Sequence, residues 1–260
     1  MICTCPFSLL AQFYQKTPEV ILGSTWKDHQ FYSFKEALLH PDQVYELNLS
    51  HQIYTAFPPE FMELTELKSL ILSHSQIIYL PKELIFLPSL KALTLCNNPQ
   101  LDLSANTAIL AEMPYLEILR LDSCHLESFP EGSIYFSKLR HLSLSHNQIR
   151  HLSKDFFQLP LLQSLDLSFN LFEEIPADIA HLSQLTQLNC SANLLRELPA
   201  EINSLTQLEK LSLGWNSLRE ISLNPQKLTR LKTLQLTGNP LSEEEKKRIQ
   251  ALFENTDIIF

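Results

Sequence analysis

A block of the form LxxLxLxxNxL recurs along this chain at a fixed spacing. Leu139, Leu162, Leu185, Leu208 and Leu231 each open such a block, and the residue numbers of consecutive openings differ by 23 every time. A fixed period of this length is typical of a solenoid, in which each repeat is one structural unit that stacks on the next. The period therefore constrains the fold before any single residue is considered.

Nine repeats follow one another without a break from Val44. Their openings are Val44, Leu67, Leu90, Leu116, Leu139, Leu162, Leu185, Leu208 and Leu231. The interval between openings is constant except from Leu90 to Leu116, where it is longer by three. We expect the three additional residues, within Asn98 to Met113, to form an irregular bulge on the convex side. Such an insertion is tolerated because lengthening a loop costs little entropy, although insertions in repeat proteins also form binding edges.

The fourth and sixth positions of each repeat are apolar, which predicts one short strand per repeat. The fourth is leucine in all nine repeats: Leu47, Leu70, Leu93, Leu119, Leu142, Leu165, Leu188, Leu211 and Leu234. The sixth is leucine in eight, with Cys190 as a small hydrophobic substitute. Alternation of period two places these side chains on one face of a strand. Because each repeat returns the chain to the same start, the strands must be parallel.

The ninth position is asparagine in six repeats, and we interpret it as structural. These residues are Asn98, Asn147, Asn170, Asn193, Asn216 and Asn239, with Gln52, Ser75 and Cys124 in the other three repeats. A side-chain amide here can bond to backbone groups of its own turn and of the neighbouring repeat, which otherwise lack partners.

The back half of several repeats contains an apolar residue followed by proline. These pairs are Phe57-Pro58, Leu80-Pro81, Phe129-Pro130, Ile175-Pro176 and Leu198-Pro199. Proline disfavours helix at the preceding residue, so the chain turns there. We expect a short helical turn to follow, anchored by apolar residues such as Ile179, Leu182, Ile202 and Leu205. This bulkier side bends the stack with the sheet on the concave side.

The flanks of the array are expected to cover its apolar ends, which gives three regions: 1–43, 44–241 and 242–260. In the first, an apolar patch from Phe7 to Tyr14 and a segment from Tyr32 to Leu39 predict short helices, the latter opened by Ser33. In the last, Ser242 and Glu245 predict a capping box. Ile249, Leu252 and Phe253 would then lie on one helix face, and Asp257 to Phe260 predict a final strand.

Together these motifs resemble the leucine-rich repeat family, of the intracellular 23-residue type with an LPxxIxxL back half, over Val44 to Leu241. The flanks SFKEALLHPDQVYELNLS and GNPLSEEEKKRIQALFENTDIIF resemble caps of bacterial members. The resemblance implies a right-handed α/β horseshoe with a concave parallel sheet of about nine strands and a helical cap at each end. It also implies a scaffold for protein–protein interaction. Family members that are enzymes carry catalysis outside the repeats, and only 19 residues follow Leu241. We therefore expect no enzyme, including a bacterial ubiquitin-ligase type, and no cofactor.

Composition narrows the functional classes further. Only four glycines occur, and no phosphate-binding glycine motif is present. A net charge of −9 argues against nucleic acid or an anionic membrane as partner. No apolar run is long enough to span a membrane and no secretory signal is found, so we expect a monomeric cytoplasmic protein with reduced cysteines. The alternative is an effector delivered into a host cell by a route that is independent of a signal peptide.

The variable positions of the strands and turns form the candidate binding face. The eighth-position column runs His51, His74, Asn97, Ser123, His146, Phe169, Ala192, Trp215 and Gly238. Phe169 and Trp215 are two repeats, roughly 10 Å, apart. We predict that they anchor a protein partner, because aromatic residues dominate interface energies. The predicted polar surround consists of Arg120, His146, Asp166, Gln187, Asn189, Lys210 and Ser212.

Several features also have a purely structural interpretation. Phe169 and Trp215 could instead lie partly buried against the turn. His51 and His74 are neighbours, but two histidines are too few for a zinc site, so no metal is expected. Lys68, Lys91, Arg140 and Lys232 form a basic column broken by Glu117 and Glu209, which fits either a solvated row or a contact with an acidic partner. Cys3 and Cys5 lack a partnering cluster.

Overall fold

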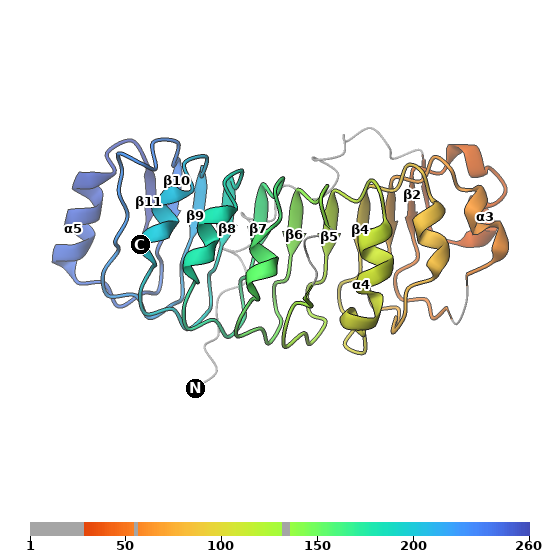
Figure 1. The fold of residues 1–260 in the computed structure, drawn as a ribbon, viewed down its shortest axis with the longest axis horizontal. Coiled ribbons are helices and arrows are strands. Elements are labelled where there is room, and N and C mark those ends of the chain that lie inside the picture. The colour runs from red at the N-terminus through yellow and green to blue at the C-terminus, as the bar shows by residue number, and fades with distance from the viewer. Residues whose placement is uncertain (1–28, 55–56, 132–135) are drawn as a thin grey trace.

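The computed structural model describes residues 29–54, 57–131 and 136–260. Within these ranges the chain forms one sheet of eleven parallel strands, each paired with the next in sequence order (Figure 1). The strands β1 to β11 are Gln30–Phe31, Glu46–Asn48, Ser69–Ile71, Ala92–Thr94, Ile118–Arg120, His141–Ser143, Ser164–Asp166, Gln187–Asn189, Lys210–Ser212, Thr233–Gln235 and Asp257–Ile259. Strands β2 to β10 belong to the nine repeats, which confirms the predicted parallel sheet. Strand β1, which the repeats do not predict, pairs with β2.

The repeated leucines form one continuous core behind the sheet. All nine fourth-position leucines are at most 2% exposed. They stack in register, as Leu165 does on Leu188. Burying one such side chain contributes about 2 kcal/mol relative to leaving it in water. Side chains at the third and fifth positions point away from this core, and we call that side of the sheet the concave face.

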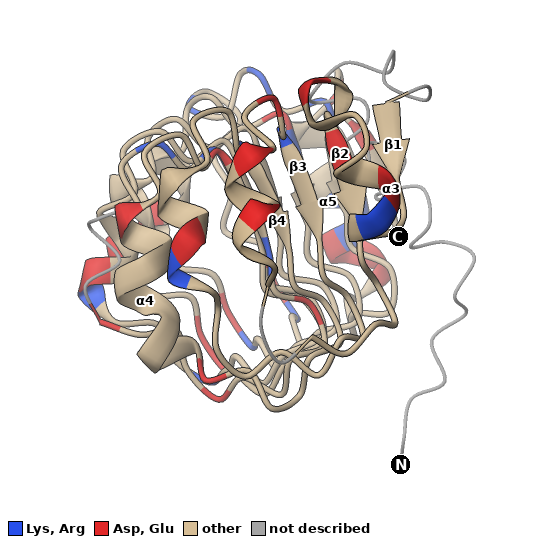
Figure 2. Cartoon of the chain, turned by 90° about the vertical axis from the view of Figure 1, so that its right-hand side faces the viewer, with Lys and Arg blue, Asp and Glu red and all other residues tan. Residues whose placement is uncertain are grey.

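Short 3-10 helices cover the other side of the core, as the view along the stack shows (Figure 2). They are η3 (Pro59–Glu63), η4 (Lys82–Phe86), η6 (Lys154–Phe157), η7 (Ala177–His181) and η8 (Ala200–Ser204). Four of them begin directly after an apolar–proline pair, as predicted, and the proline is the N-cap in each case: Pro58, Pro81, Pro176 and Pro199. The predicted anchors Ile179, Leu182, Ile202 and Leu205 are buried. The residues that follow Pro130 and Glu131, 132–135, lie outside the described ranges.

The insertion in the third repeat is helical, so the prediction of an irregular bulge is wrong. Helix α4 spans Leu103–Glu112. Its N-cap is Asp102, whose side chain accepts a hydrogen bond from the amide of Ala105. The added residues give this repeat enough chain for a ten-residue helix in place of a short 3-10 turn. Its buried Asn106 fastens the helix to the second repeat, accepting from the Leu80 amide at 2.6 Å and donating to the Ile78 carbonyl at 2.8 Å.

The ninth-position asparagines join successive turns. The side-chain oxygen of Asn147 accepts from the amides of Cys124 and Leu126, each at 3.0 Å. Its side-chain nitrogen donates to the carbonyls of Leu121 and Leu144, each at 2.9 Å. Every other asparagine of the column likewise accepts from a backbone amide of the preceding repeat and donates to carbonyls of both repeats: Asn98, Asn170, Asn193, Asn216 and Asn239.

Cys124 and Ser75 retain only the donor half of this pattern. The Cys124 thiol donates to the Leu95 carbonyl at 3.1 Å, and the Ser75 hydroxyl donates to the Leu49 carbonyl at 3.1 Å. Both carbonyls occupy the sixth position of the preceding repeat. Neither side chain supplies the amide oxygen that accepts the two backbone N–H groups. Burial raises the pKa of the Cys124 thiol to about 11, so it stays protonated and able to donate.

At the beginning of the described chain, a short helix precedes the first repeat. Helix α3 (Phe34–Ala37) begins at Ser33, whose hydroxyl accepts from the Glu36 amide at 3.3 Å. A 3-10 turn, η2 (Pro41–Gln43), leads from it toward β2. The ring of Phe34 packs edge-on against Tyr54, Phe57 and Phe61, which closes the apolar end of the first repeats. The predicted helix at Phe7 to Tyr14 lies outside the described residues.

Helix α5 (Glu243–Leu252) covers the other end of the array and is followed by β11. The Ser242 hydroxyl accepts from the Glu245 amide, but the Glu245 carboxylate does not return to Ser242. It instead accepts from the Ile221 amide at 2.8 Å and pairs with Arg248. Arg248 in turn donates to the Ile221 carbonyl at 2.8 Å, so the two side chains bind both backbone groups of Ile221.

The prediction that Leu252 lies on the buried apolar face of α5 is wrong. Ile249 and Phe253 are buried, but Leu252 is 41% exposed. Residues four apart lie one above the other on a helix, so Phe253 follows Ile249 onto the core. Leu252 ends the helix and lies beside that face.

The Glu245 contacts make the stability of this end depend on pH. Hydrogen bonding to Arg248 is the main cause that lowers the pKa of Glu245 below its ordinary value of 4.5, and the Ile221 amide adds to it. Because its pKa is lower in the folded state, the ionised Glu245 carboxylate stabilises the fold. This contribution is complete above pH 4.5 and is lost as the pH falls through the folded-state pKa. We expect Glu245→Gln to lower the free energy of unfolding by about 1 kcal/mol at pH 7. Urea unfolding should show this difference shrinking below pH 4; a difference that is constant with pH would contradict the assignment.

Candidate functional site

The eighth position of every repeat has a left-handed backbone. Its φ angles run from 54° to 62° at eight non-glycine residues, and Gly238 has a φ of 77°. This conformation costs a side-chain-bearing residue about 1 kcal/mol, whereas glycine adopts it freely. The turn imposes this left-handed conformation because the chain leaves the strand here. The next residue, the ninth-position asparagine in six repeats, must direct its side-chain amide into the stack. The side chains of this column therefore project from a rigid, hydrogen-bonded row of turns.

Phe169 and Trp215 are both half-buried, and each is supported by a neighbour in the column. The Phe169 ring stacks on the exposed His146 ring with centroids 4.0 Å apart and planes 9° apart. The six-membered ring of Trp215 lies over Gly238, because a Cβ built on that glycine would be 2.7 Å from Cδ2 and Cε3 of the indole. Partial desolvation of His146, whose ring is covered on one side by Phe169, lowers its pKa and favours the neutral imidazole in this stack.

Asp166, at the end of β7, is held by its neighbours on the concave face. One carboxylate oxygen accepts from the amide and the hydroxyl of Ser168 at 2.8 and 2.6 Å. The other accepts from the Asn189 side chain at 3.2 Å. Burial raises the pKa of Asp166 to about 6, against the opposing effect of the Ser168 hydrogen bonds. Its carboxylate is therefore partly protonated in mildly acidic solution and charged at neutral pH.

The other predicted polar residues divide between buried and half-exposed positions. Asn189 and Ser212 are 2% and 1% exposed, and Ser212 donates to the Gln235 side chain at 3.1 Å. Gln187 and Lys210 are half-buried at the starts of β8 and β9. The structure thus brings Asp166 together with Asn189, and Phe169 with His146. Trp215 and Arg120 lie on other repeats.

Asp122 is a concave-face residue that the sequence interpretation missed. It is 6% exposed and pairs with Arg120 at 2.9 Å. Its carboxylate also accepts from the Ser145 amide at 3.2 Å, from the Cys96 thiol at 3.2 Å and from the Ser143 hydroxyl. The signal was present in the sequence, because the other seventh positions are Ser, Cys, Gly or Thr and only this one is charged.

Members of the basic column form ion pairs, and the two neighbouring histidines stack on each other. In the basic column, Glu117 pairs with Lys91 at 2.9 Å and Arg140 at 3.6 Å, and Glu209 pairs with Lys232 at 2.7 Å. The His51 and His74 rings stack with centroids 4.6 Å apart, which keeps their nitrogens from converging. Across the described ranges, no three His, Cys, Asp or Glu side chains are grouped so that they could hold a metal ion.

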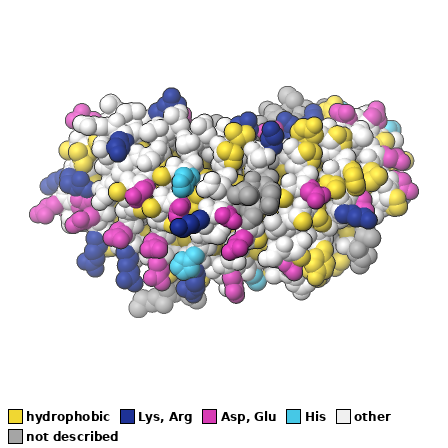
Figure 3. All heavy atoms as spheres, viewed as in Figure 1, with side chains coloured by type: hydrophobic (Ala, Val, Ile, Leu, Met, Phe, Trp, Pro, Cys, Tyr) yellow, Lys and Arg dark blue, Asp and Glu magenta, His cyan; other side chains and the backbone are white. Residues whose placement is uncertain are grey.

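Apolar side chains gather on the convex side of the first repeats (Figure 3). Met62, Ile78, Tyr79, Phe86 and Tyr115 are each at least 40% exposed. At the repeat positions of Ile78 and Tyr79, later repeats carry Glu173 and Glu174, Arg196 and Glu197, and Arg219 and Glu220. The sequence interpretation did not single out this convex surface.

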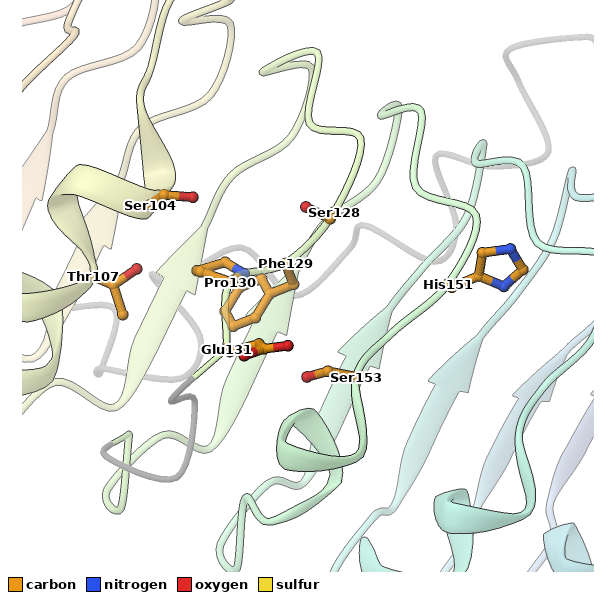
Figure 4. A pocket seen from close by; sticks show the side chains of 8 residues that line it. All are labelled: Ser104, Thr107, Ser128, Phe129, Pro130, Glu131, His151 and Ser153. Atoms are coloured by element: carbon orange, nitrogen blue, oxygen red, sulfur yellow. The ribbon is translucent and has the colours of Figure 1, made fainter.

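A polar hollow of about 480 Å³ lies on the convex side between α4 and η6 (Figure 4). It is lined by Ser104, Thr107, Ser128, Phe129, Pro130, Glu131, His151 and Ser153. The lining includes serine, histidine and glutamate, which are residue types of a nucleophile–base pair. Figure 4 shows His151 well apart from Ser128 and Glu131, and no hydrogen bond joins these residues in the described structure.

The repeats, the sheet and the asparagine column can now be compared with known proteins. A family model described as a leucine-rich repeat region matches residues 106–256. The chain belongs to the leucine-rich repeat family. This confirms the resemblance drawn from the repeats. A search of curated proteins found no match.

Solved structures of leucine-rich repeat proteins share the fold. A leucine-rich repeat protein of Leptospira interrogans is 33% identical in sequence to this chain, and the two structures superpose with a TM-score of 0.68. The match covers 85% of this chain and 62% of the Leptospira protein. This chain thus spans less than two thirds of that protein. The leucine-rich repeat domain of the type III effector XopL is 25% identical to this chain, with a TM-score of 0.66. The match covers 86% of this chain and 78% of the effector domain. An internalin of Listeria monocytogenes is 24% identical to this chain, with a TM-score of 0.62. The match covers 89% of this chain and 71% of the internalin, and at this identity it supports only a shared fold. In the described part of this leucine-rich repeat chain, no helix is long and apolar enough to cross a membrane.

Proposed function

We propose that this leucine-rich repeat chain is a non-catalytic scaffold that binds a protein partner on the concave face and the adjoining turns. The observation that carries the proposal is the presence of Phe169 and Trp215 at left-handed positions, with φ angles of 54° and 56°. Glycine would relieve this strain, as it does at Gly238. The turn imposes this backbone in every repeat, so what distinguishes Phe169 and Trp215 is that they carry large aromatic side chains there, of the kind that anchor protein–protein interfaces.

The polar surround supports this assignment. Asp166, Gln187 and Lys210 supply a carboxylate, an amide and an ammonium group on three consecutive strands. Asn189 and Ser212 continue the row of Asp166 on the next two strands and hold neighbouring side chains in place through hydrogen bonds. His146 supports Phe169, and Arg120 adds a cation further along the face. Aromatic anchors within a polar surround are the usual anatomy of a protein–protein interface.

Affinity capture with the intact chain tests the proposal. Partners captured by the wild type should be lost with a Phe169→Ala/Trp215→Ala double variant. A Tyr79→Ala/Phe86→Ala variant removes two exposed aromatic side chains from the convex side and is the matched control. Equal capture by all three proteins, or loss only in the convex-side variant, would refute the concave-face assignment.

Trp215→Ala alone should weaken binding of a captured partner by more than ~2 kcal/mol, or about thirtyfold in Kd, because aromatic anchors of this kind dominate interface energies. Isothermal titration calorimetry with the purified partner measures the change. Asn97→Ala, at the same turn position in the third repeat, is the control and should leave Kd unchanged. An unaltered Kd for Trp215→Ala would remove this residue from the site.

A second setting for the same binding activity is action inside a host cell. The likeness to the leucine-rich repeat domain of a type III effector supports it. Fusing the chain to an enzymatic translocation reporter distinguishes this role from a scaffold in the producing cell. Reporter activity inside host cells would support delivery, and activity confined to the producing cell would support the scaffold.

A further inference from the structure

The eighth-position column has a gap at Ala192, between its two large aromatic residues. The amide of Phe169 donates to the Ser191 carbonyl at 2.9 Å, and the amide of Ala192 donates to the Gly214 carbonyl at 2.8 Å. These bonds make the turns of the sixth, seventh and eighth repeats direct neighbours. Between two aromatic side chains, the seventh repeat therefore contributes only the methyl group of Ala192.

The rings on either side rest on neighbours that lie away from Ala192. Phe169 stacks on His146 of the preceding repeat, and Trp215 covers Gly238 of the following repeat. A glycine is required at the second contact, because any Cβ there would meet the indole at 2.7 Å. Among the described residues, no ring contact joins Phe169 and Trp215 across the gap.

The gap is wide enough to admit one large apolar side chain. Neighbouring strands are ~4.8 Å apart, so the backbone positions of Phe169 and Trp215 are roughly 10 Å apart. Because both rings rest on neighbours that lie away from Ala192, the space between the rings is at least that wide. A large side chain that enters this space rests on the Ala192 methyl group and can contact the ring on either side. A water-filled space of this width would leave two aromatic faces exposed, so filling it removes apolar surface from water.

The seventh repeat carries a second exposed apolar side chain close in sequence to Ala192. Leu194 follows two residues later and is 44% exposed. Of the ten exposed large apolar side chains in the described ranges, eight precede residue 116, and Leu194 and Leu252 are the other two. The equivalent residue of the next repeat is the polar Ser217. Because Ala192 and Leu194 carry no charge or hydrogen-bonding group, they favour an apolar occupant over a charged one.

We propose that Phe169, Ala192, Leu194 and Trp215 form a specificity site, the Ala192 gap, which receives one large apolar side chain from the protein partner. This inference rests on the proposed function and identifies the partner by its chemistry. The partner presents a segment with a single leucine, isoleucine, methionine or phenylalanine whose side chain enters between the two rings. Polar residues beside it face Asp166, Gln187 and Lys210.

Peptides selected from a random phage-displayed library on the intact wild-type chain are the probe. Ala192→Leu fills the gap and should weaken the selected peptides at least tenfold. Ser123→Leu makes the same kind of addition at the same left-handed turn position, outside the gap, and should leave binding unchanged. Cutting the one large apolar side chain of each peptide to alanine should also cost at least tenfold. Thermal unfolding of each variant verifies that the fold is retained.

The outcomes separate this inference from the proposed function. Binding that is unaffected by Ala192→Leu but lost in a Gln187→Ala/Lys210→Ala variant would overturn the Ala192 gap and leave the concave-face function standing. Binding unaffected by both variants would overturn both. Peptides that require a charged residue in place of an apolar one, or a selection that enriches no peptide on the wild type over Ala192→Leu, would also overturn the gap.

Discussion

Phe156→Ala will lower the free energy of unfolding by about 3 to 5 kcal/mol, the cost of emptying a fully buried aromatic site. Phe156 has no exposed surface and lies in η6 at the repeat position that Ile179 and Ile202 occupy later. Its ring meets Phe129 and Phe157 edge-on, with centroids 5.2 and 5.3 Å apart. Alanine would remove both contacts and leave a cavity between two repeats.

Urea unfolding followed by circular dichroism measures this loss. Phe86→Ala is the matched control, because Phe86 also lies in a 3-10 turn but is 62% exposed. Surface changes of that kind alter stability by about 0.5 kcal/mol or less. A loss below about 1 kcal/mol for Phe156→Ala would show that the neighbouring rings collapse into the space.

Asn147→Ala will lower the free energy of unfolding by about 3 kcal/mol, because it leaves several buried backbone groups without partners. Two amide N–H groups and two carbonyls that bond to Asn147 at 2.9 to 3.0 Å lose this side chain together. Asn147 is 6% exposed, so water does not readily replace the amide. Repeat proteins unfold through interfaces between neighbours, and this change weakens one of them.

Two further variants divide this effect between donor and acceptor. Asn147→Ser retains a hydroxyl donor, as Ser75 does in the second repeat, and should lose about half as much stability as Asn147→Ala. Gln148→Ala, at the adjacent exposed residue, should change stability by about 0.5 kcal/mol or less. Equal losses for the serine and alanine variants would show that the amide oxygen carries the whole effect.

The repeat period predicts most of the architecture because it is enforced at every step of the stack. A leucine at the fourth position has the same environment in each repeat, so one local rule places nine strands and their core. The turns after Pro58, Pro81, Pro176 and Pro199 follow for a similarly local reason, since proline limits its own backbone and that of its neighbour. Where the period breaks, at the insertion, the same reasoning failed and a regular helix was missed. The Asp102 cap and the helix-compatible run after it were the overlooked signals.

The candidate site was only partly predictable. The columns identify which residues share a turn, and Phe169 and Trp215 follow from them. The columns do not show that Asn189 and Ser212 are buried. They also do not show that the Asp122 carboxylate contacts Arg120, Ser143 and Cys96. Such contacts join side chains of different repeats and depend on their rotamers, which are set by packing.

The sequence alone determined the parallel stack, its register and the apolar core, because a strict period allows one structural solution that buries every leucine. Tertiary structure decided how the side chains of the proposed binding face are placed. The left-handed turn makes the eighth-position side chains project together, and contacts with His146 and Gly238 decide how the Phe169 and Trp215 rings lie. Ring orientation depends on neighbours a full repeat away along the chain, and only the stacking of the repeats brings those residues into contact.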